Sequence, residues 1–520
     1  MGITSLYYFC LLAVGISIYY IIPKKCRWVW ILVLSVGYFL TTGSALLLLF
    51  PVLQTGAAYL SGIGMDKAGD GEEAQNSKKG WMLTGVTGNL ICLVICKYLN
   101  FGLYTYNGFI DLFNIDAQPL DIIRIAVPIG MSFYTLSLIG YVLDIYYGGI
   151  EAERDPLRLL TYSMYFPAIV SGPILRYGDI GKSLFEGHSY DHKQITFGLQ
   201  RIFWGCFKVL VISSRLNGIT APVFGNSGEY SSLTLMLAAL AFVMELYTNF
   251  SGSIDIIMGA SECLGIKLPE NFNSPFLSKS VQEFWRRWHI TLGDWVKVFI
   301  FYPLLRTEYF RELPARLKKG LSDKLPGRLS TGFSKKTAKT VTTFTAMFIL
   351  WLSVGLWHGG SWKYLVGSGI LHWFYILLEE TGEPLWSKLR APFKGRVGAF
   401  VLRVWQSVRT YLLISIAFVF FNSGSLRAGF SMLADMIANG SEGMNASALI
   451  AGKDAVILIF SLLILSAVDL AHTLTDVREW IAARPLPVRW IIYYALIFMV
   501  ILLGNYGPGY DAAEFIYRGF

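Results

Sequence analysis

His358 is the residue whose type and position point most directly to chemistry. It lies in the segment GLWHGGSW (residues 355–362), between two long apolar runs. Ionisable side chains at membrane depth are rare and usually mark functional sites. Because the ordinary pKa of histidine is about 6.5, a neutral imidazole there can take a proton from a hydroxyl. Proton transfer is therefore the functional hypothesis, and a buried histidine that only packs is the alternative.

A second histidine, His289, lies in the aromatic segment FWRRWHITLGDW (residues 284–295). Read as a helix, this segment places Trp288, His289 and other apolar side chains on one face, with charged side chains on the other. That pattern predicts an amphipathic helix in the membrane interface, with tryptophan anchors and a basic face. By periodicity alone, the favoured interpretation is that His289 packs on the apolar side.

Two further charged side chains lie in regions that are predicted to enter the membrane. Arg176 belongs to YFPAIVSGPILRYGDI (residues 165–180), where Pro and Gly interrupt a helix. It could bind a phosphate or carboxylate, or it could extend its charged end to the membrane interface. Asp255 lies in a short apolar run within residues 247–276. A histidine or basic partner in the core is one hypothesis for Asp255, and a helix cap or structural ion pair is equally compatible.

The composition defines the class of protein. Of the 520 residues, 54% are hydrophobic and 15% are charged, whereas soluble domains carry about 25% charged residues. We predict an all-α polytopic membrane protein with about eleven spans, together with re-entrant and interfacial helices. The candidate apolar runs are residues 4–22, 28–41, 44–61, 81–104, 122–147, 196–214, 229–250, 338–357, 362–378, 408–421, 453–471 and 487–504.

The positive charge is concentrated in one loop. The net charge is +9, and residues 304–340 hold ten Lys and Arg against three acids. The positive-inside rule makes this loop cytoplasmic, and a second basic stretch at residues 388–403 lies on the same side. The apolar pair between these two stretches is therefore predicted to be a hairpin, whose turn holds His358 away from the cytoplasmic surface. No folded basic domain is present that would favour nucleic-acid binding.

Several classes of site lack support in the sequence. No nucleotide-binding loop, serine-hydrolase motif or HExxH zinc motif occurs, so these chemistries have no local signature. The six cysteines form no CxxC pair and are interpreted as small apolar residues. His188 and His192 have a metal-like spacing, but their surroundings are typical of a solvated loop. No metal site is expected.

The histidine segments together carry a family resemblance. Residues 284–289 (FWRRWH) and 355–359 (GLWHG) resemble the membrane-bound O-acyltransferase (MBOAT) family. Supporting blocks similar to its bacterial branch are PIGMSF, GPI, FSG, LPENF and the ending EFIYRGF, and most of the resemblance covers about residues 120–380. The segment at 407–429 is similar to proteins of alginate O-acetylation.

The resemblance implies one membrane-embedded domain over residues 1–520, with a core at about 120–380 and additional C-terminal helices at 400–520. It implies transfer of an acyl group, acetyl above all, from a cytoplasmic thioester such as acetyl-CoA to hydroxyls of an exported polysaccharide or wall glycan. Transfer would be direct or through an extracytoplasmic SGNH-type acceptor protein. Membrane lipid is the other expected partner, no bound cofactor is expected, and the location is the bacterial cell membrane.

Carried over by the resemblance, His358 is the catalytic histidine and His289 is the second one. The candidate contacts to substrate or donor are Arg176, Trp288, Trp357, Asp255 and Asn271. A neutral imidazole can act as general base on the acceptor hydroxyl, and an acyl-histidine intermediate is the other route. Alternative functions are D-alanyl transfer to teichoic acids and transport of a polysaccharide precursor.

Overall fold

The computed structural model describes residues 2–69, 71–123, 125–322 and 329–507. Within these ranges the chain is largely helical and forms no strand, and its β-structure is limited to isolated bridges such as that between Tyr230 and Met444. The prediction of an all-α polytopic membrane protein is thereby confirmed.

Eight described helical segments are long and apolar enough to cross a membrane, judged by length and composition. They are Ala45–Lys67, Glu72–Leu112, His192–Gly225, Ser232–Cys263, Lys335–His358, Gly395–Asn422, Gly452–His472 and Leu486–Leu503. Several other predicted runs form shorter helices. The run predicted at residues 122–147 is helical only as α6 (Met131–Tyr146), because Gly130 takes a left-handed conformation with φ 72° just before it.

The contacts divide the chain into two compact units, which are described separately. Unit 1 comprises residues 1–222, 241–274 and 446–520, and unit 2 comprises residues 223–240 and 275–445. The expectation of a single domain over the whole chain stays a prediction.

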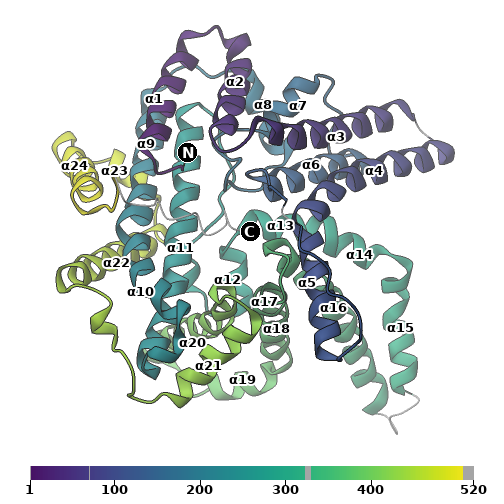
Figure 1. Cartoon of the computed structure of the whole chain (residues 1–520), viewed down its shortest axis with the longest axis vertical. Helices are drawn as coiled ribbons and strands as arrows, with labels where there is room; N and C mark the ends of the chain where they lie inside the picture. The colour runs from purple at the N-terminus through teal and green to yellow at the C-terminus, as the bar shows by residue number, and fades with distance from the viewer. Residues whose placement is uncertain (1, 70, 124, 323–328, 508–520) are drawn as a thin grey trace. The chain divides into compact units, whose positions relative to one another are not determined.

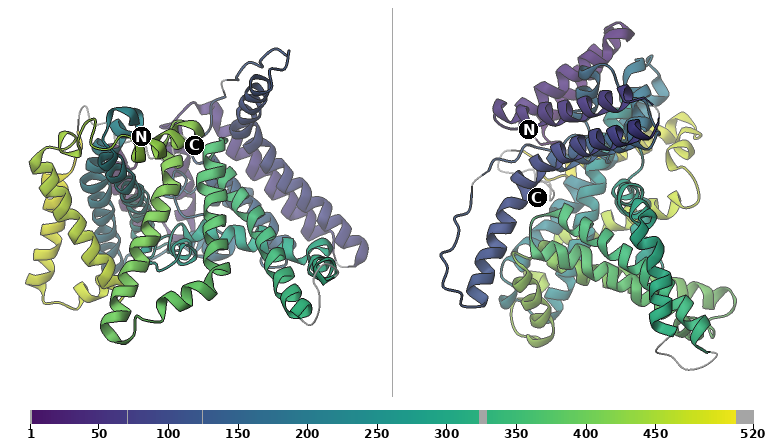
Figure 2. Two further views of the ribbon diagram at one scale, coloured as in Figure 1. Left: turned by 90° about the horizontal axis from the view of Figure 1, so that it is seen from below. Right: turned by 90° about the vertical axis from the view of Figure 1, so that its right-hand side faces the viewer.

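Unit 1 begins with a group of packed helices. These are α1 (Leu6–Ile21), α2 (Arg27–Leu40), α3 (Leu49–Lys67), α4 (Glu72–Leu93), α5 (Leu99–Leu112), α6, α7 (Pro156–Ser163) and α8 (Tyr177–Glu186). Among them, α3 and α4 lie side by side, as Figure 1 and Figure 2 both show. The rest of unit 1 is built from α9 (His192–Cys206), a π-helix η4 (Phe207–Ser213), most of α10 (Ser214–Gly225) and α11 (Ser232–Cys263), and then α22 (Gly452–His472), α23 (Val477–Ala482) and α24 (Leu486–Leu503).

A glycine seam joins α9 to α11. A Cβ atom built on Gly205 would lie 2.4 Å from the carbonyl oxygen of Gly252, and one on Gly252 would lie 2.8 Å from that of Gly205. About two helical turns away, a Cβ on Gly198 would lie 2.6 Å from the carbonyl oxygen of Gly259. Small residues at helix contacts are how membrane helices approach closely. The seam therefore brings the backbones of α9 and α11 into close contact.

Unit 2 carries the two histidine segments. Its helices are α12 (Val281–Arg287), α13 (Ile290–Val296), α14 (Tyr302–Arg306), α15 (Glu308–Ser322), α16 (Leu329–His358), α17 (Trp362–Tyr364), α18 (Leu371–Thr381), α19 (Glu383–Arg390), α20 (Gly395–Asn422) and α21 (Leu426–Ala438). The predicted hairpin forms between α16 and the π-helix η8 (Leu365–Ile370). A Cβ on Gly369 would lie 2.9 Å from the carbonyl oxygen of Trp351, so the two arms of the hairpin pack through glycine.

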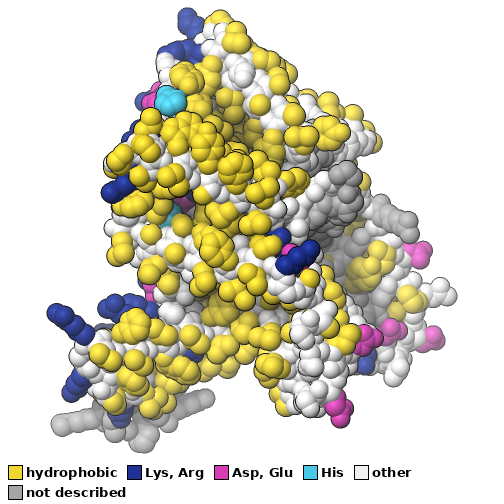
Figure 3. All heavy atoms as spheres, turned by 90° about the vertical axis from the view of Figure 1, so that its left-hand side faces the viewer, with side chains coloured by type: hydrophobic (Ala, Val, Ile, Leu, Met, Phe, Trp, Pro, Cys, Tyr) yellow, Lys and Arg dark blue, Asp and Glu magenta, His cyan; other side chains and the backbone are white. Residues whose placement is uncertain are grey.

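The outer helices present apolar side chains outward. On α24, Ile491 and Leu502 are 68% and 73% exposed, and only 6% of the apolar window of that helix is buried. Figure 3 shows hydrophobic side chains over much of one face of the molecule. Apolar surface of this extent is stable in lipid rather than in water, in agreement with a multi-pass membrane protein.

Candidate active site

His358 is the last residue of α16, at the turn of the hairpin. Its side chain is 3% exposed, and its imidazole lies 5.1 Å from the ring of Trp357 and 5.4 Å from that of Phe421 on α20, centroid to centroid. A Cβ on the next residue, Gly359, would lie 2.5 Å from the ring of Tyr364. Only glycine therefore fits directly after this histidine, which explains the sequence His-Gly at the hairpin turn.

His289 lies between α12 and α13 in a left-handed conformation, with φ 47° and ψ 52°. The expectation of one continuous amphipathic helix over residues 284–295 is wrong, because α12 ends at Arg287 and α13 begins at Ile290. The break follows from packing: Trp288 is 1% exposed and stacks on Phe284 at 5.2 Å. A non-glycine residue held at positive φ is strained, and such strain is concentrated at functional sites.

Trp357 contacts both histidines. Its indole lies 5.3 Å from the imidazole of His289 and 5.1 Å from that of His358, each in an edge-to-face arrangement. Trp357 is 6% exposed and His289 is 1% exposed, so both imidazoles lie in a water-poor interior. The structure thus brings together, within unit 2, two histidines and a tryptophan that come from separate sequence segments. Their catalytic role stays a prediction.

Burial also determines the charge of His289, which lies outside the candidate spans. Removal from water disfavours the imidazolium and lowers the pKa of His289 to about 3. The side chain is therefore neutral at physiological pH. A neutral imidazole can accept a proton or donate one hydrogen bond, whereas a cationic one can only donate.

A third histidine and several aromatic rings complete the surroundings. His372 on α18 is fully buried and lies 4.7 Å from the ring of Trp285 and 5.8 Å from that of Phe418. Phe418 in turn lies 5.8 Å from Phe421, which contacts His358. Sequence reasoning missed both phenylalanines. They come from α20, far along the chain, and their only signal is an aromatic run that any apolar helix can carry.

The remaining candidate residues belong to unit 1, except Trp288, which precedes His289. The guanidinium of Arg176 donates two hydrogen bonds to the carboxylate of Asp144 on α6, at 2.5 and 3.2 Å. The arginine is thus engaged with a buried carboxylate, and this bidentate geometry is the one that Arg favours with carboxylates.

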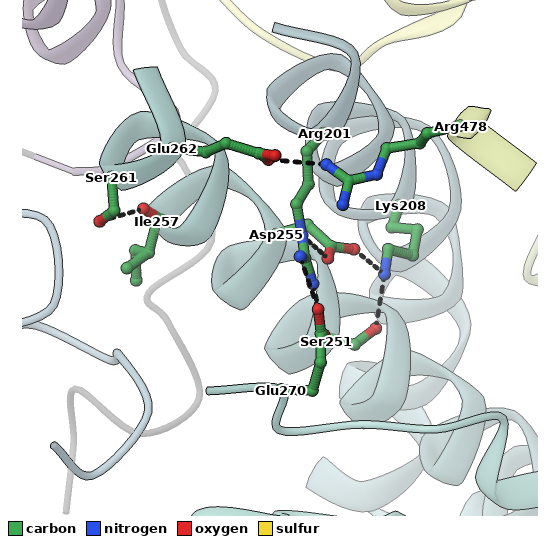
Figure 4. A network of polar contacts seen from close by, with 9 residues as sticks. All are labelled: Arg201, Lys208, Ser251, Asp255, Ile257, Ser261, Glu262, Glu270 and Arg478. Atoms are coloured by element: carbon green, nitrogen blue, oxygen red, sulfur yellow. Dashed lines mark hydrogen bonds and ion pairs between the residues drawn. The ribbon is translucent and has the colours of Figure 1, made fainter. Parts of the chain in front are cut away.

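Asp255 lies in a network of buried charges on α11 (Figure 4). Its carboxylate contacts Arg201 at 3.0 Å and also pairs with Lys208. Arg201 in addition binds Glu270 through two contacts of 2.8 and 2.6 Å. Asp255 therefore has basic partners in the core, as one hypothesis expected, and these partners form a structural ion pair, as the other expected. The cations are Arg201 and Lys208. Asn271, the residue after Glu270, is fully buried.

No metal site is apparent in the part of the chain that the structure describes. No three His, Cys, Asp or Glu side chains gather there in a way that could hold a metal ion.

Comparison with known proteins shows which proteins this chain is similar to. Residues 152–313 match the model of the membrane-bound O-acyltransferase family. A protein of Pseudomonas aeruginosa named probable alginate O-acetylase is 28% identical, over 84% of this chain and 75% of its own length. One with the same name in Azotobacter vinelandii is 27% identical, over 84% and 78%. A peptidoglycan O-acetyltransferase of Helicobacter pylori is 24% identical, over 69% and 65%.

Proposed function

We propose that this chain, an O-acyltransferase of the MBOAT family, moves an acetyl group from a cytoplasmic thioester to hydroxyls of an exported polysaccharide. The observation that carries the proposal is the contact of His289 and His358 with one buried indole, that of Trp357. Two buried imidazoles beside a rigid aromatic ring suit proton transfer in a water-poor site.

The reaction can be written with one imidazole and no further reagent. The imidazole of His358 accepts the proton of the acceptor hydroxyl while the hydroxyl oxygen bonds to the thioester carbonyl carbon. The carbon–sulfur bond then breaks, and the imidazolium returns the proton to the leaving thiolate. His289 contacts the same indole, that of Trp357, and its neutral state allows it to orient a polar group.

The choice of acyl group and acceptor is supported by the relatives. Two of them are named alginate O-acetylases, and a third is named for peptidoglycan, which is also a glycan. An acetyl donor and a polysaccharide acceptor are common to all three names. We therefore favour acetyl transfer to a polysaccharide over transfer of D-alanine.

The donor side is proposed from charge. The end of α14 and the helix α15 carry Arg306, Arg311, Arg316, Lys318 and Lys319. Such a basic stretch attracts the phosphates of acetyl-CoA on the cytoplasmic side. The same charges also favour the cytoplasmic orientation of this segment. On the opposite side, the acetyl group would pass to the polysaccharide directly or through an SGNH-type acceptor protein.

The test uses the purified full-length protein in lipid nanodiscs, with labelled acetyl-CoA and alginate or peptidoglycan fragments as acceptors. The wild type should transfer label, and His358→Ala should lose about 10²–10⁴-fold in kcat. His192→Ala is the matched control, because His192 is exposed at the start of α9. If His358→Ala is folded and transfers label at the wild-type rate, the proposal is wrong.

A further inference from the structure

Several carboxylates on the helices of unit 1 are matched by cations. Each of four helix carboxylates has an arginine or lysine within ion-pair distance in the described structure. The pairs are Asp144 with Arg176, Asp255 with Arg201 and Lys208, Glu262 with Arg478, and Asp454 with Arg215. This pattern is what the energetics of charge in lipid require, since an ion without a counter-ion is costly there.

Glu245 differs from these four carboxylates. It lies on α11 within a candidate span and is 2% exposed. Its carboxylate accepts hydrogen bonds from the side-chain amide of Asn217, at 2.9 Å, and from the hydroxyl of Thr220, both on α10. No lysine or arginine of the described residues forms an ion pair with it. Its partners are therefore neutral.

Charged groups on neighbouring helical segments of unit 1 are occupied elsewhere. Arg215, two residues before Asn217, binds Asp454 at 3.1 Å and two backbone carbonyls. Lys208 binds Asp255 and the hydroxyl of Ser251. On α22, Asp469 accepts from Tyr247 at 3.1 Å and adds negative charge rather than removing it. None of these groups neutralises Glu245.

A second observation points to an occupant at the same face. Asn249 follows Glu245 by four residues, so both side chains lie on one face of α11. Asn249 is 3% exposed, and its Oδ1 has no hydrogen-bond partner among the described residues. A buried amide oxygen without a donor is costly, and nearly all such atoms in proteins are satisfied. Turning the amide of Asn217 would present another oxygen, because oxygen and nitrogen of an amide exchange places at little structural cost.

We propose that Glu245, Asn249, Asn217 and Thr220 form a site for one positively charged occupant, a proton or a small monovalent cation, between α10 and α11. A carboxylate, two amide oxygens and a hydroxyl are the hard oxygen ligands that a sodium ion takes in proteins, and a proton on the carboxylate meets the same charge requirement. The site is separate from the histidines of unit 2 and does not depend on acyl transfer.

The test follows thermal unfolding of the full-length protein in detergent at constant ionic strength. Lowering the pH from about 8 to about 6 should raise the wild-type Tm by about 3 °C if the occupant is a proton. Replacing choline chloride by sodium chloride at about pH 8 should raise it similarly if the occupant is a cation. The infrared band of a protonated carboxylic acid, present in the wild type only, would identify the proton.

Glu245→Gln is neutral at every pH, so both shifts should disappear in it, while the exposed Glu442→Gln should keep the wild-type profile. Should Glu245→Gln fail to fold, Asn249→Ala replaces it. That variant keeps the carboxylate and loses one oxygen, so it should lose the sodium shift and keep the proton shift and infrared band. If the wild type shows no infrared band and no sodium shift, or if Glu245→Gln retains both shifts, the site does not exist.

Discussion

The imidazole of His289 lies 5.3 Å from the indole of Trp357, with the two ring planes at 65°. This edge-to-face contact places the left-handed residue between α12 and α13 against the end of α16, one residue before His358. The indole is therefore the shared wall of both histidines. Its removal is expected to disturb two imidazoles at once, whereas loss of either histidine disturbs one.

Trp357→Ala is expected to lower kcat for acetyl transfer by about 10²-fold, because displacement of a catalytic group by about 1 Å has that effect. Trp357→Phe keeps an aromatic wall and should lose less. Steady-state transfer from labelled acetyl-CoA measures both. Trp362→Ala is the control, since Trp362 lies in the same turn but is 50% exposed. Equal losses in Trp357→Ala and Trp362→Ala would mean that the turn is merely fragile.

General-base catalysis by His358 predicts that no acetyl-enzyme accumulates. The imidazole lies between the rings of Trp357 and Phe421, a geometry in which accepting a proton needs only a hydrogen bond, while bonding to carbon needs open approach. Labelled acetyl-CoA is mixed with the protein in the absence of acceptor, and peptides are then analysed by mass spectrometry. Acetyl label on the His358 peptide would instead establish the covalent route. His289→Ala is analysed as the control, so that label at other sites is recognised as background.

Stability should fall in acid partly through His289. Burial lowers its pKa to about 3 in the folded state, whereas the unfolded chain binds a proton below about pH 6.5. The unfolded state therefore gains protons that the folded state lacks as the pH falls from about 6.5 towards 3. The contribution is a loss of up to about 1.4 kcal/mol per pH unit in this window, and none above it.

His289→Phe lacks this proton-linked loss, so its free energy of unfolding should decline less between about pH 6.5 and pH 4 than that of the wild type. Denaturant titrations at several pH values measure the difference. His192→Phe serves as the control, because His192 is exposed. Parallel pH profiles for the wild type and His289→Phe would show that His289 is hydrated and protonated normally in the folded protein.

The glycine seam of unit 1 makes a separate prediction about stability. Gly205→Ala would place a methyl group 2.4 Å from the carbonyl oxygen of Gly252, so the helices must separate, at a cost of about 1–3 kcal/mol. Gly218→Ala is the matched control on α10. A Cβ there meets nothing within 4 Å, so the helix should gain up to about 1 kcal/mol. Thermal unfolding in detergent measures both, and equal shifts would contradict the seam.

Much of the architecture could be predicted because it depends on composition. Long apolar runs and few charges require membrane spans, and the basic residues around α15 and α19 predict the orientation of the hairpin whose turn holds His358. For Asp255, only the charge of the partners could be predicted. An acid at membrane depth needs a cation, but nothing in the local sequence indicates that Arg201 and Lys208 supply it.

The sequence by itself determined that this is an all-α membrane protein, and it showed that two histidine segments resemble those of the membrane-bound O-acyltransferase family. Only the tertiary structure decided that His289 interrupts its helix and that Trp357 contacts both imidazoles. The physical reason is that periodicity reports which side of a helix is apolar, whereas packing between distant segments decides whether the helix continues. The same holds for Glu245, whose lack of a cationic partner among the described residues is visible only when the neighbouring helices are in place.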